Sequence, residues 1–290
     1  MKKTLIAVAA LASTAAFAQV TMSGSVAFGF QNTMKDSTAR LQLTDADITV
    51  SASQDLGGGM KASAAMTIES ENMRSNMVNV GSTKASLSGG FGAINYFNGL
   101  SCAAKLSPGI SAEDDTCDIL GGYANINGFT YTLPTFVKGL TLGMDAYGVG
   151  GTGTPETQLA LKDSSARDYF ASYTSGPIWL YYEFANNAYN DFRGSYDFGA
   201  VKVSARVRDY DAAGAANRTE LALSAPMGAI SAGLHYVKQG TTSGTGITVS
   251  YALSKTASFQ FTSVDADNYL GGTKAGASGS NYRFQFKQSF

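Results

Sequence analysis

The sequence has few charges and few of the residues from which most catalytic and metal sites are built. Charged residues make up 15% of the chain, against roughly 25% in a typical soluble domain. Lysine and arginine number 21 and aspartate and glutamate 22, so there is no basic excess for binding nucleic acid. One histidine and two cysteines exclude most metal sites made of those residues, and we expect no metal ion and no other cofactor.

The sequence also lacks a long apolar run, and it has one short apolar stretch at the N-terminus. Lys2 and Lys3 precede the apolar stretch 4–11, and Ala16-Phe17-Ala18 places small residues before Gln19. This pattern predicts a secretory signal peptide, residues 1–18, that is cleaved between Ala18 and Gln19. An N-terminal anchor helix is the alternative. Residues 19–290 hold no run long enough for a transmembrane helix, and the export signal fits a bacterial envelope, where disulfides can form.

The remaining chain alternates between apolar and small or polar residues. In residues 20–30, for example, Val26 and Phe28 alternate with Ser25, Ala27 and Gly29. A period of two predicts β-strands with one apolar face. Similar alternation occurs at 41–54, 60–71, 129–133, 140–147, 178–184, 201–208, 220–225, 230–236, 247–253, 259–261 and 282–287.

The expected connections between these strands fall into two sizes. Tight, glycine- or proline-containing turns are expected at 55–59, 89–92, 134–139, 175–177 and 226–228. Longer polar loops are expected at 31–40, 71–82, 99–120, 148–165, 240–246 and 265–279. Short turns at one end and long loops at the other are typical of outer-membrane barrels. Strands of about ten residues give a count of 16, and fourteen or eighteen strands also fit the sequence.

The fold class predicted from these patterns is all-β, a transmembrane antiparallel β-barrel. A soluble β-sandwich would also alternate, but its outer face is usually charged, whereas the polar face here is mainly Ser, Thr, Ala, Gly and Asn. In lipid every backbone N–H and C=O must be paired, so a spanning sheet has to close. The apolar face then meets lipid, and a barrel of 16 strands encloses an aqueous channel.

Several segments in order resemble the Gram-negative general porin family of the proteobacterial type. Residues 19–24 resemble its first strand, 55–62 and 87–94 its first two periplasmic turns, and 131–140 the turn after its constriction loop. Phe290 resembles the C-terminal aromatic residue that the family uses as an assembly signal. The resemblance covers most of residues 19–290.

The resemblance implies an outer-membrane channel for passive diffusion of ions and small hydrophilic solutes. It implies one barrel domain, residues 19–290, in the lipid bilayer, assembled into a homotrimer and inserted by the outer-membrane assembly machinery. Its third loop, about residues 99–120, would fold into the lumen as a constriction. We predict a disulfide between Cys102 and Cys117 in this loop, with two free thiols as the alternative.

In porins a basic wall cluster faces an acidic constriction loop, and charged rings bias which ions enter. The acidic loop residues here would be Glu113, Asp114, Asp115 and Asp118. Strand parity points these basic side chains into the pore: Lys61, Lys84, Arg193, Lys202, Arg206, Arg208, Arg218, Arg283 and Lys287. It points these acidic side chains inward: Asp47, Glu69, Asp145, Glu183, Asp197 and Glu220. Arg206 and Arg208, two apart on one strand face, are the best candidates for a basic ladder.

The chain departs from the family pattern at two wall positions. Asp47 and Asn98 stand where relatives often carry arginine, so the sign of the ion selectivity stays open. A substrate-specific channel for sugars or organic anions is an alternative, marked by the inward aromatic residues Tyr147, Trp179 and Tyr181. A structural or adhesive barrel with a blocked lumen is another, but no plug-sized segment is present.

Enzymatic activity is not expected. Barrel hydrolases need a general base, usually histidine, and the single histidine is His235. No acidic or nucleophilic neighbour of His235 is identifiable in the sequence, so no catalytic residue is assigned.

Overall fold

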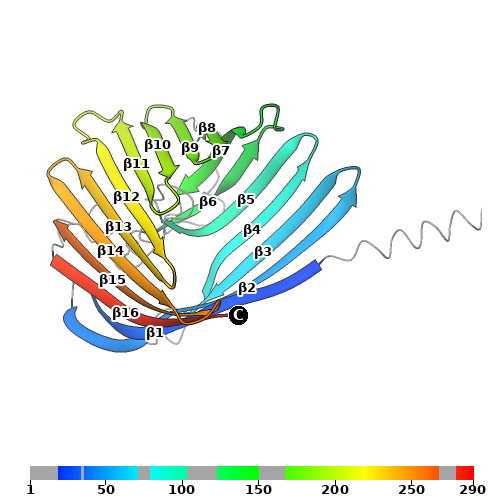
Figure 1. The fold of residues 1–290 in the computed structure, drawn as a ribbon. Coiled ribbons are helices and arrows are strands. Elements are labelled where there is room, and N and C mark those ends of the chain that lie inside the picture. Colours follow the sequence, from blue (N-terminus) through cyan, green and yellow to red (C-terminus); the bar gives the residue numbers. More distant parts are fainter. Residues whose placement is uncertain (1–18, 34–35, 71–78, 103–122, 150–166, 268–278) are drawn as a thin grey trace, which may run out of the picture.

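The computed structural model describes residues 19–33, 36–70, 79–102, 123–149, 167–267 and 279–290. Sixteen strands form one closed barrel in which each strand pairs with its neighbours in the sequence. Figure 1 shows β16 returning beside β1, where the two close the wall. All pairs are antiparallel, and closure leaves no open sheet edge. The predicted fold class and strand count are therefore confirmed.

The strands are close to the expected length of about ten residues, except for the longer β1 and β2. Their bounds are β1 Gln19–Thr33, β2 Asp36–Gly57, β3 Met60–Glu69, β4 Asn79–Gly89, β5 Gly92–Cys102, β6 Tyr123–Thr132, β7 Leu140–Val149, β8 Arg167–Ser175, β9 Ile178–Ala185, β10 Tyr189–Asp197, β11 Lys202–Tyr210, β12 Arg218–Met227, β13 Ile230–Gln239, β14 Thr242–Ala252, β15 Ala257–Asp267 and β16 Gly279–Ser289.

Side chains sort between the two faces of the wall as the period-two pattern predicts. Phe28 is 51% exposed and its neighbour Ala27 is fully buried; Phe192 is 52% exposed and Asp191 is fully buried. Large apolar residues thus cover the outside, and small, polar and charged residues the inside. This is the reverse of a soluble protein and is the arrangement of a barrel in lipid. No helix among the described residues is long and apolar enough to cross a membrane.

Tight turns join every even-numbered strand to the next, from the two residues 58–59 to the seven residues 133–139. Gly58 and Gly59 have φ values of 63° and 78°, which glycine adopts without strain. The five tight turns expected from the sequence all lie at these connections.

Two of the expected long loops are wrong. β1 runs to Thr33 and β2 begins at Asp36, so most of 31–40 is strand; likewise β13 ends at Gln239 and β14 begins at Thr242. The second hairpin closes through Gly240, with a φ of 62°, and through the Thr242 hydroxyl, which donates to the Gln239 carbonyl at 2.8 Å. Polar composition was therefore mistaken for loop, because strand ends can stay paired while carrying polar side chains. The other four expected loops fall largely outside the described residues.

The C-terminus is tied to the first strand. The Phe290 N–H donates to the Gly24 carbonyl at 3.0 Å, and the Gly24 N–H donates back at 3.1 Å. A Cβ on Gly24 would lie 2.5 Å from Phe290 Cζ and 2.3 Å from the Asp47 carbonyl oxygen. Only glycine therefore lets Phe290 approach β1 so closely.

Candidate functional site: the inner wall of the barrel

The inner faces of β9 to β13 carry a connected group of charged side chains, which we call the ionic cluster. Its members are Glu183, Asp191, Arg193, Arg206, Arg208, Arg218, Glu220 and His235. Six of them, Glu183, Glu220 and the four arginines, were among the inward-pointing residues predicted from the sequence. The period of two places them on one face, and strand pairing brings them into contact.

Asp191 is the centre of the cluster. Its Oδ2 lies 2.7 Å from Arg193 Nη2, 2.6 Å from Arg206 Nη2 and 2.6 Å from Arg208 Nη2. The Asp191 side chain has no solvent exposure. One buried carboxylate thus accepts charge-assisted hydrogen bonds from three guanidinium groups, which offsets the cost of burying its charge.

Glu220 forms a second centre on β12. Its Oε1 lies 3.0 Å from Arg206 Nη1 and 2.6 Å from Arg218 Nε, and its Oε2 lies 3.0 Å from His235 Nε2. Arg206 therefore bridges the two buried acids. His235 does have an acidic neighbour, contrary to what the sequence allowed us to identify, because the contact depends on the pairing of β12 with β13.

Strand register places like charges opposite each other in this cluster. Arg193 is directly opposite Arg206, and Arg208 is directly opposite Arg218. Such pairs destabilise a sheet unless acids lie between them. Asp191 contacts both arginines of the first pair, and in the second pair Asp191 contacts Arg208 while Glu220 contacts Arg218. Every arginine of the two pairs therefore has a carboxylate partner.

The cluster is layered from the wall toward the lumen. The side chains of Asp191 and Glu220 are fully buried, whereas those of Arg193, Arg208 and Arg218 are 15%, 15% and 11% exposed. The acids therefore lie behind, and the edges of three guanidinium groups lie in front.

Tyrosines extend the cluster toward β8. The Tyr189 hydroxyl lies 2.5 Å from Glu183 Oε1 and 2.9 Å from Asp168 Oδ2, and the Tyr181 hydroxyl donates to Glu183 Oε2 at 2.9 Å. The guanidinium of Arg208 lies over the Tyr189 ring at 3.8 Å. These cation–π contacts and hydrogen bonds fix the cluster side chains in place.

Two of the aromatic residues predicted to face inward form a short row on β8 and β9. The Tyr181 ring is 5.8 Å from both Phe170 and Trp179, with interplanar angles of 17° and 18°. Arg193 lies over the same Tyr181 ring at 4.8 Å. The side chain of the third residue, Tyr147, lies outside the described ones.

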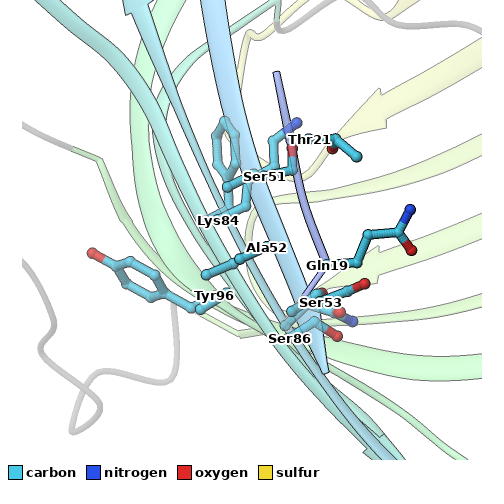
Figure 2. Close-up of a pocket in the computed structure, with 14 residues that line it drawn as sticks. Gln19, Thr21, Ser51, Ala52, Ser53, Lys84, Ser86 and Tyr96 are labelled. Atoms are coloured by element: carbon cyan, nitrogen blue, oxygen red, sulfur yellow. The ribbon is translucent and has the colours of Figure 1, made fainter. Parts of the chain in front are cut away.

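The opposite stretch of wall, formed by β1 to β5, is built from small polar residues. It borders a hollow of about 590 Å³, whose inner-face lining is Gln19, Thr21, Ser51, Ser53, Ser63, Ala65, Lys84, Ser86, Asn95 and Phe97. The outer-face residues Ala52, Ala64, Ala85 and Tyr96 of the same strands also border it. Figure 2 shows Gln19, Thr21, Ser53 and Ser86 pointing to the same side, while Tyr96 points to the other. Thr49 and Thr67 continue this hydroxyl lining, with their Oγ1 atoms 2.9 Å apart.

The predicted basic residues outside the ionic cluster are scattered. Lys61 is exposed beside the tight turn at the start of β3. Lys84 lies over the Phe97 ring at 5.6 Å. Lys202 is opposite Asp197, at the turn between β10 and β11.

The predicted acidic residues Asp47 and Glu69 also lie apart from the ionic cluster, whereas Asp145 on β7 is directly opposite Asp168, whose Oδ2 lies 2.9 Å from the Tyr189 hydroxyl. Asp47 and Glu69 are opposite each other on β2 and β3, and the Glu69 carboxylate covers Gly81, where a Cβ would leave it no room. The Thr130 hydroxyl donates to Asp145.

Other predicted site residues lie outside the described part of the chain. They are the signal peptide with Ala18, the constriction-loop acids Glu113, Asp114, Asp115 and Asp118, and Cys117 with the side chain of Cys102. The predicted disulfide and the inward fold of the loop stay predictions.

Sequence reasoning missed three acids of the inner face. Asp191 precedes Arg193 by two residues, so the period of two could have found it. Asp168 is fully buried on β8. Asp45, whose Oδ2 lies 2.9 Å from Lys287 Nζ, follows an irregularity in which Ala27 pairs with Asp45 but Phe28 pairs with Leu43. That bulge cannot be read from alternation.

Comparison with solved structures supports the fold. A mutant of the Rh. blastica porin is similar with a TM-score of 0.65 and 12% identity, covering 94% of this chain and 100% of that chain. A structure described as an anion-selective porin from Comamonas acidovorans has a TM-score of 0.61 and 20% identity, with the same coverage. A search of the curated proteins found no match.

A family model extends these likenesses to the sequence itself. The model described as Gram-negative porin matches residues 4–270, which is nearly all of the chain. Its members are outer-membrane channels, and the closed barrel, the apolar outer face and the polar inner wall agree with that membership. The chain belongs to the Gram-negative porin family.

Proposed function

We propose that this chain forms a water-filled outer-membrane channel through which ions and small hydrophilic solutes diffuse, and that the inner wall described above is the surface they pass. Membership of the porin family carries the outer-membrane location and the passive channel. The proposal also covers which wall residues the solutes pass, the oligomeric state of the chain and the cleavage of its signal peptide.

The division of side chains between the two faces supports this function most strongly. A chain that exposes Phe28 and Phe192 outward and buries Arg206 and Glu220 inward is matched to lipid outside and to water and ions inside. Sixteen strands enclose a space wide enough for water.

Single-channel recording from the purified protein in planar bilayers tests the proposal. We expect stepwise openings whose conductance rises in proportion to bulk salt, because ions cross in water rather than by binding. A correctly folded protein that passes no current would contradict the channel and favour a structural or adhesive barrel.

Processing at Ala18–Gln19 is supported by the pairing of Gln19. Gln19 of β1 pairs with Ser53 of β2, so the residue that follows the expected cleavage site already lies in the sheet. Mass spectrometry of the exported protein is expected to find Gln19 at its N-terminus. A retained leader would favour the anchor helix.

Self-association is supported by a patch of small residues on the outer face. Ala52, Ala64 and Ala85 lie directly opposite one another across β2, β3 and β4. Small side chains let membrane-embedded surfaces approach closely. We propose that this patch meets further copies of the chain in the expected homotrimer.

Phe290 is proposed as the assembly signal read by the outer-membrane assembly machinery. The residue is 58% exposed although its backbone pairs with Gly24. An aromatic residue that is held in the sheet and yet accessible from outside fits this role.

Enzymatic activity is not part of the proposal. His235 is 2% exposed and its partner is Glu220; no hydroxyl or thiol hydrogen-bonds to it in the part of the chain that the structure describes. A substrate-specific sugar channel is less well supported, because the Phe170, Tyr181 and Trp179 rings contact one another and Arg193 covers Tyr181.

A further inference from the structure

We infer that Asp191 sets the charge selectivity of the channel by neutralising, from behind, the arginine edge that borders the lumen. This inference rests on the proposed conducting channel. It concerns how much of the arginine charge acts on ions in the pore.

The contacts of Asp191 differ from those of the other acids in the cluster. Its carboxylate is shared among Arg193, Arg206 and Arg208, with Oδ2 within 2.7 Å of a nitrogen in each. It is fully buried, whereas Arg193 and Arg208 keep some exposure. An ion in the lumen therefore meets guanidinium edges first, with the compensating charge directly behind them.

The charges of the cluster nearly cancel. Four arginines face the three acids Glu183, Asp191 and Glu220, which leaves a formal net charge of about one with His235 neutral. Opposite charges held within hydrogen-bond distance act on a remote ion mainly as dipoles, whose potential falls off faster than that of a single charge. The pore wall therefore attracts anions less strongly than its row of arginines in the sequence alone would suggest.

Removing the Asp191 charge would raise the formal net charge of this layer from about plus one to about plus two. A unit charge roughly 8 Å from a permeating ion, in water at 0.1 M salt where the Debye length is about 10 Å, changes the anion-to-cation permeability ratio about two-fold. At 1 M salt the Debye length is about 3 Å, and the change is expected to be nearly absent.

Reversal potentials across a salt gradient test the inference in the full-length protein. Asp191→Asn is expected to raise the anion-to-cation permeability ratio about two-fold at 0.1 M. Arg208→Gln, which keeps Asp191, is expected to lower the ratio by a similar factor. The double variant is expected to return to the wild-type ratio, because its net charge is restored.

Asp197→Asn is the matched control. Asp197 lies on the same strand, six residues on and at the exposed turn end, where its Oδ1 accepts from the Gly199 N–H at 2.7 Å. The same loss of charge there is expected to change the ratio much less. If Asp191→Asn does not fold, the comparison of Arg208→Gln with Asp197→Asn still tests the direction in which a charge of the ionic cluster changes the permeability ratio.

The outcomes separate the inference from the function on which it rests. A folded wild type that passes no current would overturn the channel, and with it the role of Asp191. A conducting wild type whose ratio is unchanged in Asp191→Asn, or shifted in the same direction by Asp191→Asn and Arg208→Gln, would overturn the role of Asp191 alone. Opposite shifts that cancel in the double variant would support it.

Discussion

Two stretches of one barrel wall differ in the size of their side chains on both faces. In β2 to β4 the outer face carries Ala64 and Ala85 and the inner face carries serines such as Ser63. In β9 to β12 the outer face carries aromatic residues such as Phe192, and the inner face carries the ionic cluster around Arg206. We call these the thin wall and the thick wall.

The comparison shows that side-chain volume, and not the sheet, decides what each stretch of wall can contact. Both stretches have the same paired backbone, which a membrane requires. The thick wall satisfies its own charges and meets lipid with rings. The thin wall leaves room inside for water and solutes, and its small outer side chains are those that we propose meet a second copy of the chain.

Breaking the thick wall at its centre is expected to have the largest effect. Arg206→Ala would remove the bridge between Asp191 and Glu220, both fully buried. Each acid keeps other partners, so we expect a loss of about 3 kcal/mol in the free energy of unfolding. Equilibrium unfolding in urea, with the barrel refolded in lipid, measures it.

Lys61→Ala is the control for Arg206→Ala. Lys61 is an exposed cation at the turn end of the thin wall, so its loss is expected to cost under about 1 kcal/mol. Equal losses for the two variants would show that the ionic cluster contributes no more than a surface charge does.

A bulky residue on the outside of the thin wall is expected to act on assembly rather than on the barrel. Ala64→Trp would place a large ring in the alanine patch and would cost about 2 kcal/mol at a closely packed interface. We expect a shift from trimer to monomer, measured by sedimentation in detergent. Ala205→Trp, an exposed alanine on the outside of β11, is the matched control and is expected to leave the trimer intact.

If Ala205→Trp dissociates the trimer and Ala64→Trp does not, the interface lies on the thick wall. A monomeric wild type would contradict the proposed role of the alanine patch altogether. Either result would separate the small outer side chains of β2 to β4 from self-association.

The period of two in the sequence was sufficient to predict the barrel and the sharing of faces within one strand. Arg206 and Arg208 lie on the same face, as expected. The evidence is that both donate hydrogen bonds to Asp191. Alternation is a local property of the chain. Every strand of a barrel in lipid shows it, because one face meets lipid and the other faces the lumen. The tight turns could also be predicted, because the glycines clustered within 57–59 and 89–92 are typical of turns.

Contacts between strands could not be predicted in the same way. That Glu220 meets His235 depends on the register of β12 against β13, which alternation does not fix. That Asp45 meets Lys287 depends on a bulge in β2. The hairpin at Gly240 was missed because its polar residues are equally compatible with a loop and with a strand end that extends beyond the lipid.

The smallest expected effect compares one kind of hydroxyl pair in two settings. Thr67→Val removes the contact with Thr49 in the thin wall, where both residues are half-buried; Thr262→Val removes the contact with Thr248, where both are buried. Valine keeps the shape and deletes the hydroxyl. If water reaches the thin wall, it replaces the lost partner of Thr49, and Thr67→Val lowers the free energy of unfolding by about 0.5 kcal/mol. Thr262→Val leaves Thr248 unpaired in a dry site and lowers it by about 1 to 2 kcal/mol. Urea unfolding of both variants measures the difference. Equal costs would mean that the two hydroxyl pairs are equally dry, and the thin wall would then not be the wet side of the channel.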